Sequence, residues 1–360
     1  MMAPTKMWPM AVTPVLSPLG KLRAGFEYFL PPSRDDRDES MAAFVRRRLG
    51  REVFERLVEP LVSGVYAADM EKLSLLATLP RFREMERKHG SLIRAMRKQM
   101  QAARAAGRHV DQSGARYSMF VTLQRGLSSL IDALAARLPK AAVRLGTNVV
   151  RVEPSGGGWR VETGEGRSDR FDALILATPS HVAAGLLKPV AAELSGDLAG
   201  IEHEGTAIVT MAFEASQVKH PMHGAGFVVP SIEGSPILAG SFSSRKYTHR
   251  APEGKTLIRT FVGGARAPEM AEMPDAELVP LVLEELREVL GISGGPIYQV
   301  TAHWPRTMPQ YHVGHLDLAA RIERRCGALA GLALAGNAYG GVGIPACIHS
   351  GEQAAAKLLG

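Results

Sequence analysis

A glycine-rich run near the carboxyl end of the chain has the residue types and spacing of an anion-binding turn. Gly341, Gly343 and Ala346 form G-x-G-x-x-A within "GNAYGGVGIPACIHSG". The apolar stretch "GLALA" precedes the run, and a segment that predicts a helix follows it. Glycines let backbone N–H groups approach a ligand, and a helix N-terminus adds partial positive charge. The run therefore suits a phosphate, or an anion that develops during a reaction.

A Rossmann dinucleotide fingerprint is excluded for this run. That fingerprint needs an acidic residue about twenty positions further on, at the end of a second strand, and the sequence stops fourteen residues after Ala346. Two readings stay open, a ligand-binding loop and a tight turn between strand and helix. In both, Pro345 is expected in the first helical turn, where its missing N–H costs nothing.

A second stretch, "FDALILATPSH", points to the same kind of site. It places Thr178, Pro179 and Ser180 after a buried strand, and ligands of open α/β sheets bind at such strand ends. His181 is a candidate general base, with a structural role as the alternative. No Ser/His/Asp pattern stands out. The spacing of a metal site is missing from the other candidate histidines, His303, His312 and His315.

The elements that must position these residues change in type along the chain. Residues 36–110 predict helices, with Ser40 as a cap and a bend at Pro60 and Gly64. Segment 119–138 predicts strand, turn and helix. Short strands with a glycine hairpin at 156–158 follow, and 201–305 predicts longer strands interrupted by a helix at 275–290. Composition and spacing thus indicate a ligand-binding α/β protein with two domains.

The segment 81–108 is strongly basic, with nine Lys/Arg against two Glu, in a chain of net charge +7. Three interpretations remain: a solvated helix face, an anionic membrane surface, and, least favoured because aromatic stacking residues are missing there, nucleic acid. The uncharged run from Cys326 to Ser350 predicts a strand and loop rather than a membrane span, because six glycines interrupt it. The two cysteines and the proline-rich start favour a reducing compartment and no signal peptide.

Three stretches resemble the protoporphyrinogen oxidases of the amine-oxidase and phytoene-desaturase flavoprotein group. "GNAYGGVGIPACIHSG" resembles their C-terminal flavin-contacting segment, "PLVSGVYAADMEKLSLLATLPRFREMERKHGSLI" (60–93) their helical domain, and "HWPRTMPQYHVGHL" (303–316) their W-P-x-x-x-P-Q-Y-x-x-G-H segment. The resemblance extends from about residue 3 to the end. It implies a mixed α/β fold: an incomplete Rossmann-like FAD domain, a helical membrane-binding insertion and a mixed-sheet substrate domain. The implied boundaries are 1–111 helical, 112–180 FAD, 181–313 substrate and 314–360 FAD.

The resemblance also implies site residues. The loop would lie against the isoalloxazine ring, where N–H groups stabilise charge on the reduced flavin. The cofactor residues would be Val149, Trp304, Val342, Gly343 and Ile344. Core packing is the alternative for Val149 and Trp304. Gly226, Val228 and Phe261 would line an apolar substrate pocket.

The implied reaction is the six-electron oxidation of protoporphyrinogen IX or coproporphyrinogen III to the porphyrin, with O2 reoxidising FAD and yielding H2O2. No catalytic acid–base side chain and no metal are expected. The expected location is cytoplasmic or peripheral on the inner face of the cytoplasmic membrane, and a homodimer is left open. Two alternatives remain, another flavoenzyme of the group, such as a desaturase or amine oxidase, and a non-catalytic porphyrin- or membrane-binding module.

One departure from the family pattern matters. Members begin with a strand and a G-x-G-x-x-G turn that holds the FAD pyrophosphate, and the 360 residues contain no such start. We therefore expect a chain that lacks the N-terminal βαβ unit, through an internal start codon, a fragment, or a unit supplied by a second polypeptide. Such a chain would bind FAD weakly or not at all. Lys6 is the candidate for the substrate-clamping cation of the family.

Overall fold

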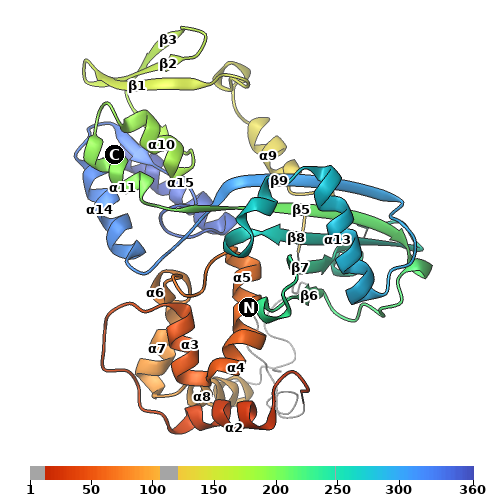
Figure 1. Ribbon diagram of the computed structural model, residues 1–360. Helices are drawn as coiled ribbons and strands as arrows, with labels where there is room; N and C mark the ends of the chain where they lie inside the picture. Colours follow the sequence, from red (N-terminus) through yellow and green to blue (C-terminus); the bar gives the residue numbers. More distant parts are fainter. Residues whose placement is uncertain (1–12, 106–120, 248) are drawn as a thin grey trace. The chain divides into compact units, whose positions relative to one another are not determined.

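The computed structural model describes residues 13–105, 121–247 and 249–360 of a mixed α/β protein (Figure 1). Lys6 lies outside these residues. The chain forms two compact units. The first is Met1–Val121 with Glu204–Thr307, and the second is Thr122–His203 with Met308–Gly360. The boundaries at 111, 180 and 313 stay predictions.

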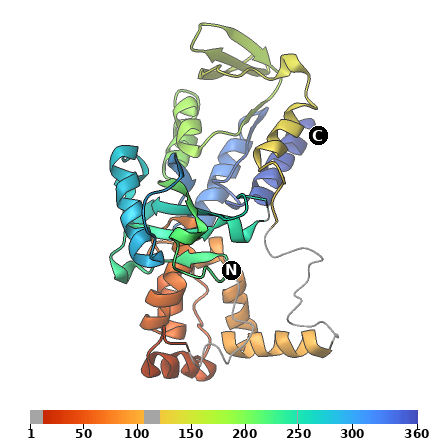
Figure 2. The same cartoon turned by 90° about the vertical axis from the view of Figure 1, so that its right-hand side faces the viewer.

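A five-stranded sheet with the order β6-β7-β8-β5-β9 is built mainly from the first unit. Its strands are β5 (His203–Glu214), β6 (Gly226–Val228), β7 (Ile237–Phe242), β8 (Lys255–Gly263) and β9 (Tyr298–Pro309). Helix α13 (Asp275–Leu290) lies across one face (Figures 1 and 2). Short elements join the strands: α12 (Ser243–Lys246), η4 (Ala215–Gln217), η5 (Ser231–Glu233), η6 (Gly264–Arg266) and η7 (Pro268–Ala271).

Strand alternation explains why this sheet has one buried face. Ala207, Val209, Met211 and Phe213 of β5 are fully buried, and they pack in one cluster with residues of α13 such as Leu286. The residues between them point to the opposite face, because successive side chains of a strand alternate. The sequence segments that predicted strands and the helix at 275–290 are confirmed here. On the opposite face, Val228 and Ala239 lie against Gly64 of α5 (Glu59–Tyr66).

The helical part of the first unit comprises α2 (Pro18–Phe26), η1 (Glu27–Phe29), α3 (Met41–Leu49), α4 (Arg51–Val53), η2 (Phe54–Val58), α5 (Glu59–Tyr66), α6 (Leu75–Thr78), α7 (Pro80–His89) and α8 (Leu92–Ala105). Ser40 caps α3 as expected, since its Oγ accepts from Ala43 N at 3.1 Å. The bend expected at Pro60 and Gly64 is wrong. Both lie inside α5, where Pro60 occupies the first turn and Gly64 allows a close approach to Ala239.

A buried ion pair joins the helices of this part. Arg48 of α3 and Glu27 of η1 are 1% and 0% exposed, and the Arg48 guanidinium donates to the Glu27 carboxylate. The same carboxylate accepts from Ser91 Oγ at 2.6 Å and from the backbone N of Leu92 at 2.8 Å and Ile93 at 3.1 Å. Glu27 therefore satisfies the N-terminus of α8 and neutralises Arg48 at once.

The second unit has two small sheets. β1 (Val149–Ser155), β2 (Gly158–Thr163) and β3 (Ser168–Phe171) form an antiparallel sheet whose first turn is the glycine hairpin. β4 (Leu174–Leu176) and β10 (Leu332–Leu334) pair in parallel. Around them lie α9 (Ser128–Ala135), η3 (Lys140–Ala142), α10 (Ser180–Leu187), α11 (Ala192–Ala199), α14 (His315–Gly327) and α15 (Ile344–Leu359). The strand expected before α9 is absent at 121–123, the described part of that stretch.

Contacts distant in sequence hold the second unit together. Trp159, 1% exposed, packs with Leu176, Leu332 and Ile322 in one core. Its Nε1 donates to the carbonyl of Ala330, 171 positions along the chain, at 3.0 Å. Among the described residues, no helix is long and apolar enough to span a membrane.

Candidate functional site

The glycine loop joins β10 to α15 in a backbone conformation that needs glycine. Gly341 has φ +148°, and a Cβ built on it would lie 2.7 Å from Cβ of Ala346. Ordinary side chains are strained at such a φ, and the close approach leaves no room for one. Gly343, by contrast, has φ −79° and only Pro345 Cδ near its Cβ position, at 3.8 Å. Of these two glycines, Gly341 is therefore the one that the turn requires.

Tyr311 fixes the loop from outside it. Its hydroxyl donates to the carbonyl of Asn337 at 2.6 Å and accepts from the backbone N of Gly341 at 2.8 Å. The tyrosine is 3% exposed, so water does not compete effectively for these bonds. A third contact ties the start of the loop to α15, where Gly336 N donates to Ser350 Oγ at 3.0 Å. The loop is thus held at its start and near its middle.

The groups beneath the loop are kept neutral. The ring of His315 stacks on Tyr311, with centroids 3.9 Å apart and 12° between the planes. Burial lowers the pKa of His315, a backbone hydrogen bond with Tyr339 raises it, and nearby His312 lowers it again, with a net decrease. Burial also raises the pKa of the Tyr339 phenol. With a neutral imidazole and a neutral phenol next to the loop, the positive charge there comes from the N-terminus of α15.

The first turn of α15 presents unused backbone donors. Gly343 is the N-cap with extended backbone, no side chain caps the helix, and Pro345 falls in the first turn as expected. The first intrahelical bond runs from Cys347 N to Gly343 O at 3.0 Å. The N–H groups of Ile344 and Ala346 precede that bond, so they lack an acceptor within the helix. Val342, Gly343 and Ile344 thus lie together at a helix N-terminus that suits negative charge.

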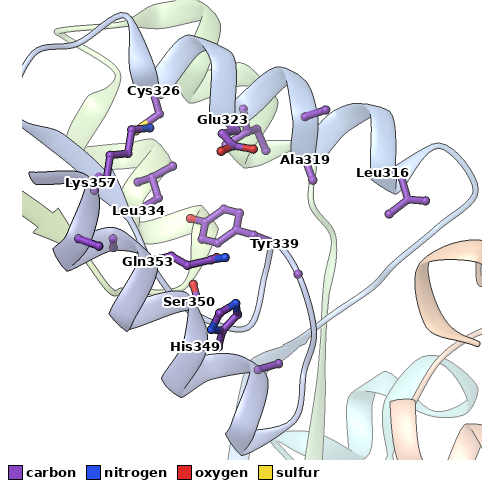
Figure 3. A pocket seen from close by; sticks show the side chains of 17 residues that line it. Leu316, Ala319, Glu323, Cys326, Leu334, Tyr339, His349, Ser350, Gln353 and Lys357 are labelled. Atoms are coloured by element: carbon purple, nitrogen blue, oxygen red, sulfur yellow. The ribbon is translucent and has the colours of Figure 1, made fainter. Parts of the chain in front are cut away.

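A cavity of about 720 Å³ lies between α14 and α15 (Figure 3). Small and apolar side chains dominate its lining, with Tyr339 between the two helices and Lys357 near Cys326. The hydroxyl of Tyr339 is buried without a hydrogen-bond partner. The cavity borders β10 through Ala333 and Leu334, and among the described strands β10 pairs with β4 alone. This side of β10 offers room and unused polar groups.

The three substrate candidates of the sequence share one face of the five-stranded sheet. Val228 pairs with Ala239 and Phe261 pairs with the same Ala239, while Gly226 lies in the next row, opposite Ser241. Directly opposed residues point to the same side of an antiparallel sheet. This face is the one away from α13. The structure therefore brings Gly226, Val228 and Phe261 together.

Trp304 lies on the same face of β9. Its neighbour His303 points toward α13, with Nδ1 2.9 Å from Ala271 O and Nε2 2.8 Å from Asp275 Oδ1. Alternation then turns Trp304 to the other side, where it is 51% exposed. The hydrogen bond to Asp275 and a second one to the backbone carbonyl of Ala271 raise the pKa of His303. Core packing, the alternative for Trp304, does not match this exposure.

The remaining candidates lie in the second unit. Val149 begins β1 and packs partly buried against the core that contains Trp159, and its flavin role stays a prediction. His181 contacts the ring of His203 edge-on at 5.0 Å, in the first turn of α10. Tyr311 and His315 were missed as site residues, although both stand in the "PQYHVGHL" stretch. A spacing rule would not have found them, because their contacts depend on the return of the chain to β10.

Comparison with known proteins assigns the chain to a family. The model of the flavin-containing amine oxidoreductases matches residues 3–359. The chain belongs to this family. A curated relative, coproporphyrinogen III oxidase of Bacillus subtilis, is 36% identical over 357 residues, which is 99% of this chain and 75% of the relative. Chloroplastic protoporphyrinogen oxidase of Nicotiana tabacum is 32% identical, over 99% of this chain and 68% of its own length.

Solved structures agree on the fold. A crystal structure of an Exiguobacterium protein has a TM-score of 0.85 and 30% identity, and covers 99% of this chain and 75% of its own. Cyclohexylamine oxidase of Brevibacterium oxydans, at 15% identity and a TM-score of 0.60 over 89% and 67% of the two chains, shares the fold alone. The mixed α/β class and the flavoenzyme family expected from the sequence are thereby confirmed.

The loop residues fit the flavin that this family contains. Gly341 permits the tight turn into α15, because a Cβ there would lie 2.7 Å from Cβ of Ala346, and the uncapped N–H groups of Ile344 and Ala346 supply donors. Val342, Gly343 and Ile344 would hold the ring end of FAD by backbone contacts. That ring accepts hydride equivalents and develops negative charge, for which a helix N-terminus is a suitable neighbour.

Proposed function

We propose that this protein is a porphyrinogen oxidase of haem biosynthesis, which oxidises coproporphyrinogen III or protoporphyrinogen IX to the porphyrin. The observation that supports it is the 36% identity with a coproporphyrinogen III oxidase over 99% of the chain. Bound FAD would supply the redox chemistry: each round would remove two electrons and two protons from the substrate, and O2 would take up both electrons and both protons to give H2O2. Three such rounds convert a porphyrinogen to a porphyrin.

The residues of this chain would bind and orient rather than transfer protons. The sheet face with Phe261 and Trp304 offers apolar surface to a macrocycle, and Val228, which lies against Gly64 of α5, would form its edge. Aromatic and aliphatic side chains are typical linings of such pockets. The loop at Gly341 offers a polar backbone to the flavin. No acid–base side chain is assigned, because an oriented substrate can deliver hydride without one.

The pyrophosphate half of the FAD site is a further part of the proposal. Gly341 to Ala346 is the only G-x-G-x-x-[GA] run of the 360 residues, and in this proposal it contacts the ring end of FAD. We infer that a βαβ unit outside these residues holds the pyrophosphate. The cavity beside β10, with Leu334 on its wall and the unpartnered hydroxyl of Tyr339, supports this inference.

An oxidation assay tests the function directly. The purified chain, supplied with FAD, is mixed with coproporphyrinogen III or protoporphyrinogen IX while porphyrin fluorescence and O2 uptake are followed together. We expect porphyrin formation coupled to O2 uptake, and none with amines or carotenoid precursors. Turnover of an amine or a carotenoid instead would favour another member of the flavin group.

A second readout separates a missing cofactor half-site from a wrong function. Porphyrin binding without O2 uptake would support the non-catalytic module, unless a supplied βαβ polypeptide from the Bacillus relative restores uptake. Stoichiometric FAD retained after gel filtration would disprove the inference on the pyrophosphate half while leaving the function intact. The proposed function would be overturned if the chain neither bound nor oxidised any porphyrinogen.

We also propose that the helical part lies peripherally on an anionic membrane surface, at the inner face of the cytoplasmic membrane. Leu19, Leu22, Phe26 and Phe29 form one helical row and are 78%, 72%, 55% and 68% exposed. Arg94 and Arg97 of α8 lie over the ring of Tyr28 in the same helical part, at 4.6 and 5.9 Å. Exposed apolar side chains beside cations are typical of interfacial helices. Arg83 takes no part, because it is buried in an ion-pair network.

Vesicle cosedimentation tests this surface. We expect the chain to bind vesicles of anionic lipid more tightly than zwitterionic ones. Leu22→Gln should weaken binding roughly ten-fold, because one leucine fewer would be buried in the bilayer surface. Val289→Gln, which removes a 44% exposed apolar side chain from α13, is the matched control. Equal binding by both variants would rule out the row on α2 and η1 as the contact surface.

A further inference from the structure

Two cross-strand rows of different character run side by side over the sheet face that points away from α13. One row is apolar: Val228 pairs with Ala239, Ala239 with Phe261, and Phe261 with Ile208. The other is polar around one cation: Gly226 pairs with Ser241, Ser241 with Arg259, and Arg259 with Thr210. The rows are two residues apart along each strand, which corresponds to roughly 6.5–7 Å.

Arg259 is the charged member of this face. Its side chain is exposed, and its guanidinium carbon lies 5.4 Å from the ring centroid of Phe261. No ion pair with an Asp or Glu of the described residues is found for it, whereas many other arginines of the chain, such as Arg287 on α13, are paired. An arginine held over an aromatic ring without an anionic partner is a ready site for a carboxylate.

The surroundings of Arg259 add positive charge. Lys246 closes α12 after β7, and α12 is fixed to β8 by a hydrogen bond from Leu257 N to Ser244 Oγ at 3.1 Å. Burial lowers the pKa of Lys246, and Arg259 lowers it further, so the two cations lie close enough to repel each other. An incoming carboxylate relieves this repulsion.

We propose that Arg259 binds a propionate carboxylate of the porphyrinogen and makes the site selective for the tetracarboxylate coproporphyrinogen III. This inference rests on the proposed function and names its substrate. Val228 and Ala239 of the apolar row lie against Gly64 of α5, so the part with Phe261 and Ile208 accepts the macrocycle. The guanidinium one row away from Phe261 pairs with an arm of the same ring. Coproporphyrinogen III has a propionate on each pyrrole ring, whereas protoporphyrinogen IX has vinyl groups on two of them. The first therefore meets Arg259 with a carboxylate in every orientation.

The products, coproporphyrin III and protoporphyrin IX, serve as probes of binding. Each is titrated by fluorescence against the FAD-supplemented chain and against Arg259→Gln and Arg259→Lys. We expect Arg259→Gln to weaken coproporphyrin III binding about ten-fold or more, as for loss of a charged hydrogen bond, and to weaken protoporphyrin IX binding less. Arg259→Lys should recover part of the loss, because lysine keeps the positive charge but cannot make the two parallel hydrogen bonds of a guanidinium to a carboxylate. In turnover the change should appear in KM more than in kcat.

Arg287→Gln is the matched control, since it removes the same charge from the α13 side of the sheet. A change below two-fold for Arg259→Gln, with tight binding by the unmodified chain, would overturn the role of Arg259 and leave the proposed function standing. Equal losses for both porphyrins would overturn the selectivity and keep the carboxylate contact. If the unmodified chain binds neither porphyrin, the proposed function itself fails.

Discussion

Gly341→Ala is expected to displace the loop before α15 and to reduce flavin binding at least ten-fold. The new Cβ would lie 2.7 Å from Cβ of Ala346, at a φ of +148° that alanine rarely adopts. Strain of this kind costs on the order of 1–3 kcal/mol, and relief requires the backbone to move away from Tyr311, whose hydroxyl holds Gly341 N. The first N–H groups of α15 follow Gly341 directly in the chain, so they would be displaced and would no longer point toward the flavin.

Titration with lumiflavin, which contains only the ring end of FAD, measures this effect without the pyrophosphate. Thermal unfolding of the flavin-free chain supplies a second readout, with a lower Tm expected for the variant. Gly340→Ala is the matched control, since a Cβ there meets no heavy atom within 4 Å. Unchanged lumiflavin affinity and Tm in Gly341→Ala would refute the requirement for glycine.

Glu27→Gln is expected to destabilise the helical part strongly. It leaves the guanidinium of Arg48, 1% exposed, with only Glu86 Oε1 at 3.5 Å as an anionic neighbour, and breaking a buried pair in this way costs about 3–5 kcal/mol. The amide also supplies one acceptor oxygen fewer for Ser91 and for the first turn of α8. The free energy of unfolding from urea titration, followed by circular dichroism, measures the loss.

Glu71→Gln removes the same charge from an exposed pair. Arg46 and Glu71 contact at 2.5 Å, but their side chains are 41% and 54% exposed, so the expected cost is below about 1 kcal/mol. Similar costs for Glu27→Gln and Glu71→Gln would mean that Glu86, whose Oε1 lies 3.5 Å from Arg48, or water is enough to satisfy Arg48 after the change. The role given to Glu27 would then be wrong.

Local patterns predicted local structure well. Ser40 as a cap, Pro345 in the first turn of α15 and the helix at 275–290 depend on neighbours a few positions away, and all are confirmed. The bend at Pro60 was wrong because a proline in a first turn begins a helix as readily as it ends one. Gly64 lies within the same helix because it packs against Ala239, which its neighbours in the sequence do not reveal.

The sequence predicted only those parts of the site that lie within one stretch of neighbouring residues. The loop 336–343 is recognisable from its glycines. The hydrogen bond from Gly341 N to the Tyr311 hydroxyl, by contrast, joins residues 30 positions apart and is not visible in the sequence. Arg259 stood within "IRTFVGGAR", two residues from the Phe261 singled out as a pocket wall. Its place beside Gly226 follows from the register of β6, β7 and β8, and no periodicity in the sequence encodes that register. The flavin and substrate roles of the named residues stay predictions until tested.

The hydrogen bond from Trp159 to Ala330 has a consequence for how the protein is made. A ribosome adds about 5–20 residues per second, so roughly 10–30 s pass between the synthesis of these two partners. During that interval β4 has no β10 to pair with, and the apolar side chains that pack around Leu332, such as Trp159 and Leu176, stay open to solvent or to chaperones. The sheet of β5 to β8 emerges in the meantime and can close first. Slower synthesis of residues 204–330 should therefore lower the yield of soluble protein.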